Sequence, residues 1–256
     1  MQTVKPTHKI VHISSLWRLD ELVDLAAEAF IEDPYWSTVF PGLHEYPESF
    51  RQIWSRQLLV EHGKKGTVTL AVCRDGDDGR SQFLGFAIWS RHGTSDATRS
   101  WQGQDDTRDK SISLKPWIAR MNSLMPIEIE LTRIRVMWNS IIHGEPLGVS
   151  DEDRNEAAEA FKNAGRLYPA ERWHLSYLAV SPKFQRRGVG KSLVSWGLER
   201  CEEEGVPAVL EASVAGRSLY ENMGFCEIGR VIYDKGRRST LVMLRSVEET
   251  EKTMDR

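Results

Sequence analysis

A short turn with the sequence Gln-Arg-Arg-Gly-Val-Gly is the feature that most constrains the fold of this chain. It covers residues 185–190, after an apolar segment at 173–180 and before an amphipathic segment that begins at 189. The first segment alternates like a strand, and the second repeats its apolar residues at helical spacing. Gly188 and Gly190 allow positive φ and a close approach of backbone to a ligand. The sequence therefore predicts a buried strand, a tight turn and a helix in immediate succession.

The same turn has the properties of an anion site. The helix that begins at Val189 presents backbone N–H groups without intrahelical acceptors and the positive end of its dipole. Arg186, Arg187 and Lys191 add positive side chains around that point. Because the whole chain has a formal net charge of -3, these cations are local and indicate no general attraction to nucleic acid. A diphosphate is the ligand that such a turn suits best.

Two segments resemble a known family of enzymes. LAVSPKFQRRGVGKSLV resembles the acetyl-CoA signature of the GNAT superfamily of N-acetyltransferases, with Gln185, Gly188 and Gly190 at the defining positions. A second block, LEASVAGRSLYENMGF, also matches the family. The resemblance is detailed over residues 173–225 and only topological before them. It implies a mixed α/β GNAT fold: helices flank a twisted, mostly antiparallel sheet whose central strands diverge to admit acetyl-CoA.

The resemblance also implies where acetyl-CoA is held. In the family, backbone amides of the turn hold the diphosphate, and the pantetheine arm lies along the open edge of the central strand. We expect Gln185 to brace the turn and Ser213 to lie beside the pantetheine arm. The residues to which these contacts carry over are Leu178, Ala179, Val180, Gln185, Arg186, Arg187, Gly188, Val189, Gly190, Lys191, Ser192 and Ser213.

Acetyl transfer from a thioester to an amine needs an acid for the thiolate and a base for the amine. The resemblance in LYENMGF places Tyr220 beside the sulfur, and a phenol with a reference pKa of ~10 keeps its proton at neutral pH. The strand HLSYLAV resembles the HLHALAV strand of the arylalkylamine N-acetyltransferases, so His174 is a candidate base. Ser176 replaces their second histidine. Glu211 is a second candidate base, and a purely structural role for His174 stays open.

The remaining segments follow the order that the family requires. Strict alternation predicts that His174, Ser176, Leu178 and Val180 share one face of their strand. The expected strands cover residues 8–14, 66–75, 81–92, 173–180 and 207–213 and a hairpin after 225. The expected helices cover residues 20–31, 48–62, 151–167 and 189–204 and a short segment before Gly224, with Ser150 or Asp151 as the cap of the third.

Two segments offer candidate walls for an acceptor pocket. An aromatic loop follows Asp33-Pro34, and residues 93–150 exceed the family's minimal plan. Residues 94–110 are polar and predict a loop, and the stretch from 114 to 143 predicts two helices. Either segment packs the core or borders the acceptor. Glu128 and Glu130, like Asp33, are acidic residues in these segments that the sequence leaves unranked.

We expect one domain over residues 1–247, with residues 93–170 as an insertion bordering the acceptor site and residues 248–256 as a flexible tail. The three cysteines, Cys73, Cys201 and Cys226, are far apart and form no CxxC pair, so no metal site or disulfide framework is expected. No apolar run approaches the ~20 residues that span a bilayer. We therefore expect a cytoplasmic monomer or homodimer with no membrane or nucleic-acid partner.

The predicted function is acetyl-CoA-dependent N-acetylation of a small, partly apolar amine by direct attack in a ternary complex. The aromatic loop and the insertion motivate the small acceptor, since they can enclose one, whereas a protein substrate needs an open groove. Two alternatives stay open. One is acetylation of a protein or peptide amine, and the other is a non-catalytic sensor that binds acyl-CoA on the same fold.

Overall fold

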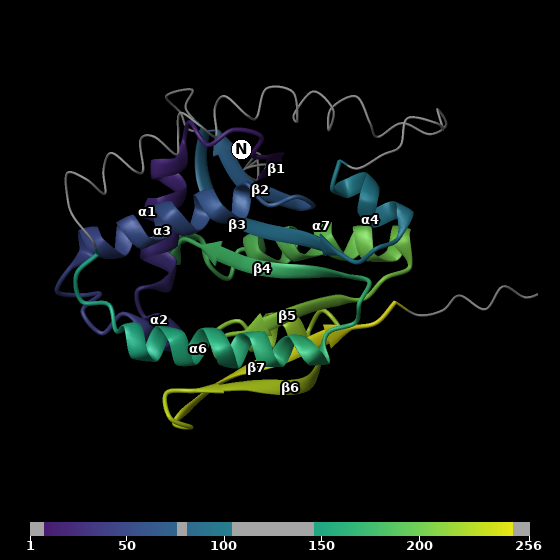
Figure 1. Cartoon of the computed structure of the whole chain (residues 1–256). Coiled ribbons are helices and arrows are strands. Elements are labelled where there is room, and N and C mark those ends of the chain that lie inside the picture. The colour runs from purple at the N-terminus through teal and green to yellow at the C-terminus, as the bar shows by residue number, and fades with distance from the viewer. Residues whose placement is uncertain (1–7, 76–80, 104–145, 248–256) are drawn as a thin grey trace, which may run out of the picture.

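The computed structural model describes residues 8–75, 81–103 and 146–247 (Figure 1). Within them, seven strands form one sheet in the order β1-β2-β3-β4-β5-β7-β6, and every neighbouring pair is antiparallel except β4 and β5. The strands are β1 (Lys9–His12), β2 (Thr67–Asp75), β3 (Ser81–His92), β4 (Arg172–Val180), β5 (Ala208–Ala212), β6 (Cys226–Tyr233) and β7 (Arg238–Arg245). With helices on both faces, this sheet confirms the predicted mixed α/β class.

Helices cover the two faces of the sheet unequally. On one face lie α1 (Leu19–Phe30) and α3 (Pro47–His62), with α6 (Asp151–Ala164) over the C-terminal strands. On the other face α7 (Val189–Glu204) packs against β2, β3, β4 and β5. Each face has its own buried apolar cluster, which we call the α1-side core and the α7-side core. The α1-side core includes Leu22, Trp54 and Phe86, whereas the α7-side core includes Leu193 and Trp173.

The aromatic loop contains a helix that the sequence analysis did not predict. Residues Pro34–Val39 form α2, where we expected irregular chain. The side chain of Asp33 accepts a hydrogen bond from the backbone N–H of Tyr35 at 2.9 Å, and Pro34 occupies the first turn. Asp-Pro therefore caps a new helix as well as ending the one before it.

The polar segment after β3 also begins with a helix instead of a loop. Residues Asp96–Trp101 form α4, whose cap Ser95 accepts a hydrogen bond from the N–H of Thr98 at 3.2 Å. Asp96 lies in the first turn, where a negative charge favours the helix. The two helices predicted between 114 and 143 and the tail after 247 lie outside the described residues.

The other predicted helices occur within about a residue of their expected starts. Ser150 caps α6 through a 3.2 Å hydrogen bond from the N–H of Asp153, which confirms it as the cap. The expected extension of this helix is a separate 3₁₀ turn, η1 (Gly165–Leu167). A second 3₁₀ turn, η2 (Pro182–Phe184), precedes the glycine turn, and the short helix α8 (Arg217–Glu221) precedes Gly224.

The parallel pair β4 and β5 separates along its length. The strands pair only from Trp173 to Leu175 on β4 and from Ala208 to Leu210 on β5. Beyond these residues, the edge of β4 that faces β5 has no strand partner within the described chain. The predicted divergence of the central strands is thus confirmed, and it opens a gap in the middle of the sheet.

Candidate active site

A β-bulge in β4 sets the direction of the side chains beside this gap. Ile88 of β3 pairs with Tyr177, and the next residue, Trp89, pairs with Leu175, so the register with β3 skips Ser176. Leu175 and Leu178 both belong to the α7 side of the sheet although they are three residues apart. The predicted common face for His174, Ser176, Leu178 and Val180 is therefore wrong, because one extra residue reverses the alternation.

The residues of β4 after the bulge pack on both faces of the sheet. After it, Tyr177 packs on the α1-side core, whereas Leu178 and Val180 pack on the α7 side. A Cβ on Gly190, in the first turn of α7, would lie within 4 Å of both Leu178 and Val180. The end of β4 thus lies under the glycine turn, while His174 and Tyr177 line a cavity on the opposite face.

The glycine turn has the left-handed backbone that its sequence predicts. Arg186 has φ of 59°, and Gly188, which precedes the first residue of α7, has φ of 86°. The side-chain amide of Gln185 donates a hydrogen bond to the carbonyl of Val180 at 3.2 Å, which ties the turn to the end of β4. Arg186, Arg187 and Lys191 are exposed around the N-terminus of α7. The geometry combines free N–H groups with positive charge, as an anion site requires.

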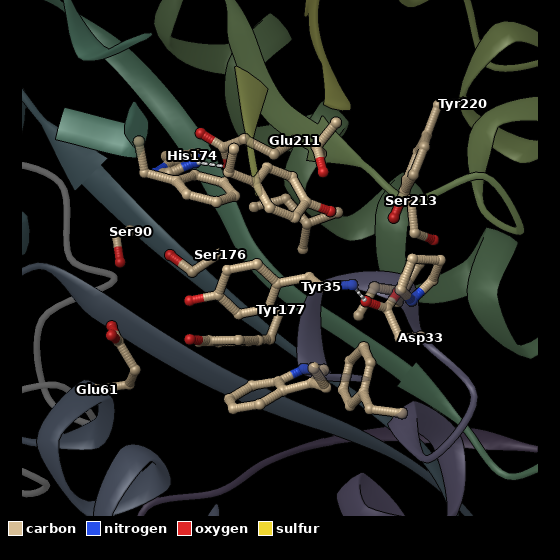
Figure 2. A pocket seen from close by; sticks show the side chains of 18 of the residues that line it. Asp33, Tyr35, Glu61, Ser90, His174, Ser176, Tyr177, Glu211, Ser213 and Tyr220 are labelled. Atoms are coloured by element: carbon tan, nitrogen blue, oxygen red, sulfur yellow. Dashed lines mark hydrogen bonds and ion pairs between the residues drawn. The ribbon is translucent and has the colours of Figure 1, made fainter. Parts of the chain in front are cut away.

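A cavity of roughly 420 Å³ occupies the α1 side of the gap. Figure 2 shows Tyr220, Ser213 and Asp33 toward one end of it and Glu61 and Ser90 toward the other. Aromatic rings supply much of its wall, and they come from α1, α2, α6, the segment before β4, β4 itself, α8 and β6. These rings are Phe30, Tyr35, Trp36, Phe161, Tyr168, Tyr177, Tyr220 and Tyr233.

Two candidate catalytic residues meet in the wall of this cavity. The Nε2 atom of His174 lies 2.8 Å from Oε2 of Glu211, and both side chains are largely buried. The hydroxyl of Tyr168 donates a hydrogen bond to the other carboxylate oxygen, Oε1. Burial raises the pKa of Glu211, but the charge of His174 and the hydrogen bonds from His174 and Tyr168 outweigh it, so the pKa is lowered overall. Glu211 is therefore a carboxylate at neutral pH.

The third candidate, Tyr220, lies on α8 and lines the same cavity. It is 7% exposed, and burial, with a smaller contribution from the charge of Glu211, raises the pKa of its phenol. A phenol in this state keeps its proton at neutral pH and can only donate it. Ser213 lies nearby at the end of β5, where its hydroxyl accepts a hydrogen bond from the N–H of Gly216 at 3.2 Å.

Residues 155–242 match the family model described as an acetyltransferase (GNAT) domain. The chain contains a GNAT acetyltransferase domain. The match confirms the predicted family and the predicted class of enzyme, an acyltransferase. The matched range of this GNAT domain includes the glycine turn, His174, Glu211 and Tyr220.

The GNAT domain also has relatives among solved structures. One is described as histone acetyltransferase HPA2 and related acetyltransferase from Corynebacterium glutamicum, with 17% identity and a TM-score of 0.51 over 95% of this chain and 99% of that chain. Another is a PaiA N-acetyltransferase from Thermoplasma acidophilum in complex with coenzyme A, with 14% identity and a TM-score of 0.46 over 94% of this chain and 99% of that chain. The first likeness shows the shared fold.

Several residues that line this cavity were not predicted from the sequence. Tyr168 precedes β4 in a segment with no motif, and His92 ends β3, where its ring centroid lies 5.8 Å from that of His174. Burial, aided by the charges of Arg172 and His174, lowers the pKa of His92 to about 4. Glu61 lines the far end, where it accepts hydrogen bonds from Gln57 and Lys64. No sequence signal marks these residues, because only the packing of the sheet brings them together.

The structure describes one of the three acidic candidates, Asp33, Glu128 and Glu130, that the sequence left unranked. Asp33 lines the GNAT cavity, and burial raises its pKa despite the hydrogen bonds it accepts from the backbone of α2. Glu128 and Glu130 lie outside the described residues. Within residues 8–75, 81–103 and 146–247, no group of three His, Cys, Asp or Glu side chains is arranged to hold a metal ion, and no helix is long and apolar enough to cross a bilayer.

Proposed function

We propose that this GNAT domain transfers an acetyl group from acetyl-CoA to the primary amine of a small, partly apolar molecule by direct attack in a ternary complex. The observation that carries the proposal is the aromatic cavity of roughly 420 Å³ that contains the His174–Glu211 pair beside the gap between β4 and β5. In this proposal the base, the acid and the acceptor lie on one side of the opened strands.

The donor is proposed to lie across the gap. The backbone N–H groups at the start of α7, with Arg186, Arg187 and Lys191, suit the diphosphate of acetyl-CoA. The free edge of β4 from Leu178 to Val180 offers backbone groups to the pantetheine arm, as an added strand would use them. One backbone N–H of this edge would polarise the thioester carbonyl.

The proposed reaction uses His174 as base and Tyr220 as acid. His174 takes a proton from the ammonium group of the acceptor, and the neutral nitrogen attacks the thioester carbonyl carbon. The C–S bond breaks with its electron pair on sulfur, and Tyr220 gives the thiolate a proton. The tyrosinate then recovers a proton from the newly acylated nitrogen. The products are an amide, the free thiol of CoA and one proton that leaves from His174.

The wall of the cavity supports a small acceptor with both charge and apolar surface. Aromatic faces attract an ammonium group and cover apolar carbon at the same time. The side chain of Asp33 lies toward the end of the cavity that also holds Tyr220, so an ammonium group entering there meets an acidic side chain.

A thiol-release assay with acetyl-CoA and a panel of amines tests the proposal. The panel contains arylalkylamines, aliphatic amines, diamines and peptides with free N-termini or lysines, and acetyl-CoA without acceptor is the control. We expect turnover with small apolar amines at a higher kcat/KM than with any peptide. Turnover with peptides alone would identify a protein acetyltransferase. Binding of CoA without turnover of any acceptor would identify a sensor.

A further inference from the structure

Tyr168 and His174 bind opposite oxygens of the same carboxylate. The Tyr168 hydroxyl donates to Oε1 of Glu211, while Nε2 of His174 lies 2.8 Å from Oε2. The Tyr168 ring also packs on the ring of His174 at 5.6 Å between centroids, and the guanidinium of Arg172 lies 5.2 Å from the Tyr168 ring centroid. Tyr168 thus contacts both members of the His174–Glu211 pair, from a segment of chain that precedes β4.

We propose that Tyr168 is a positioning residue that holds the Glu211 carboxylate against Nε2 of His174. A carboxylate accepts but cannot donate, so the His174 nitrogen facing Glu211 must carry the hydrogen. Nδ1 is then the basic nitrogen of the neutral ring, and it makes no hydrogen bond with the described residues. This inference rests on the proposed function, because it assigns Nδ1 as the atom that takes the proton of the amine.

The need for Tyr168 follows from the burial of Glu211. The side chain of Glu211 is 14% exposed, so little water reaches Oε1 if the tyrosine hydroxyl is removed. An unsatisfied carboxylate oxygen would concentrate more negative charge toward His174 and would leave the carboxylate free to rotate about its last bond. Tyr168 therefore limits how strongly Glu211 stabilises the imidazolium form of His174.

Several charged or titratable groups surround His174 besides this pair. His92 approaches from β3, Arg172 lies two residues away on β4, and Tyr220 lines the same cavity from α8. Lys64 and Glu61 lie at the far end of the same cavity. Because the Tyr168 hydroxyl donates its hydrogen bond to Glu211, a change in the titration of His174 in a variant without that hydroxyl reports chiefly on Glu211.

Two substitutions are expected to move the titration of His174 in opposite directions. Tyr168→Phe keeps the ring packing but removes the donor, so the pKa of His174 rises. Glu211→Gln removes the negative charge, so the pKa of His174 falls. Imidazole ¹⁵N NMR of the full chain measures the pKa and the tautomer directly, with Nε2 protonated in the unaltered protein. A simple loss of packing would not produce opposite shifts.

Kinetics provide the second measurement. In Tyr168→Phe we expect kcat/KM at pH 8 to fall roughly tenfold, as loss of one charged hydrogen bond allows, and the acidic limb of its pH profile to move to higher pH. The matched control is Tyr46→Phe, because Tyr46 also hydrogen-bonds a glutamate, Glu45, but does not line the cavity. An acidic limb that stays in place in Tyr168→Phe overturns the inference.

The NMR and kinetic results separate two kinds of failure. If the unaltered protein shows no acetyl transfer but Tyr168→Phe still raises the pKa of His174, the proposed function fails and the positioning contact stands. If acetyl transfer occurs and the pKa of His174 is unchanged or lowered in Tyr168→Phe, the inference about Tyr168 fails alone. A His174 that carries its hydrogen on Nδ1 would also overturn it.

Discussion

Arg91 of β3 and Glu204 at the end of α7 form a buried ion pair, with 2.7 Å between Nε and Oε2. Arg91 is 2% exposed, and its guanidinium also lies 2.8 Å from a carboxylate oxygen of Glu171, just before β4. Glu204 accepts further hydrogen bonds from the indoles of Trp101 and Trp173. The network joins β3, β4, α4 and α7 at the end of the sheet where β4 and β5 are still paired. It therefore stabilises the sheet at the end opposite the gap between these two strands.

Removing Arg91 is expected to destabilise the fold strongly. Arg91→Ala leaves Glu204 buried without its cation, which typically costs about 3–5 kcal/mol of unfolding free energy. Urea denaturation at pH 7 measures the change. The control is Arg99→Ala, because Arg99 pairs with Asp96 at the exposed surface and such pairs contribute about 1 kcal/mol or less. Equal losses in the two variants would contradict the structural role of the buried network.

The φ of Gly188 allows a test of the proposed diphosphate site. An added Cβ at Gly188 meets no atom within 4 Å, so Gly188→Ala introduces backbone strain of about 1 kcal/mol and no clash. As the turn relaxes, the N–H groups at the start of α7 move away from the diphosphate, and acetyl-CoA affinity is expected to fall by roughly fivefold to tenfold. Isothermal titration calorimetry measures the affinity.

Gly236 in the β6–β7 hairpin provides the matched control for this experiment. Its φ of 84° and its open surroundings are nearly those of Gly188, but it lies in a different turn. Gly236→Ala should lower stability to a similar extent and leave acetyl-CoA affinity unchanged. If the two variants bind acetyl-CoA equally well, the glycine turn is not the diphosphate site.

Loss of the Tyr220 hydroxyl is expected to slow the chemical step without weakening donor binding. A positioned general acid typically contributes about 10²–10⁴-fold, so Tyr220→Phe should lower kcat by about 100-fold or more. The ring packs on Phe225 and should retain that contact, so acetyl-CoA affinity should change little. Steady-state kinetics with a saturating amine give kcat, and calorimetry gives the affinity. An unchanged kcat would remove Tyr220 as the acid.

The parts of the fold that depend on local sequence could be predicted. Gly188 and the apolar residues after it specify the turn and α7 through backbone freedom and helical periodicity alone. Ser150 likewise specifies the start of α6, because a cap needs only the residues that follow it. The helix over residues 34–39 was not predicted, because Asp33-Pro34 can end one helix and also begin another, and local sequence does not distinguish these outcomes.

The parts of the site that depend on packing could not be predicted. Ser176 occupies a bulge because of the way β4 pairs with β3, and no property of a serine in a strand indicates it. The contact between Tyr168 and Glu211 joins residues 43 positions apart, and it exists only because the segment between α6 and β4 brings Tyr168 to the same cavity wall as Glu211. His174 and Glu211 were each proposed separately, and their pairing follows from adjacent parallel strands.

His92 is expected to make stability depend on pH below neutrality. The pKa of His92 is about 4 in the folded protein, against an ordinary value of 6.5. Between pH 4 and pH 6.5 the unfolded chain therefore binds a proton at His92 that the folded chain does not. The unfolding free energy should therefore be highest above pH 6.5 and should fall toward pH 4, by about 2 kcal/mol once partial exposure is allowed for. Urea denaturation across this range measures the slope.

His92→Gln should reduce this pH dependence of the unfolding free energy, whereas His44→Gln, at an exposed position, should not. An identical slope in His92→Gln and the unaltered protein would mean that His92 is protonated as readily in the fold as in the unfolded chain.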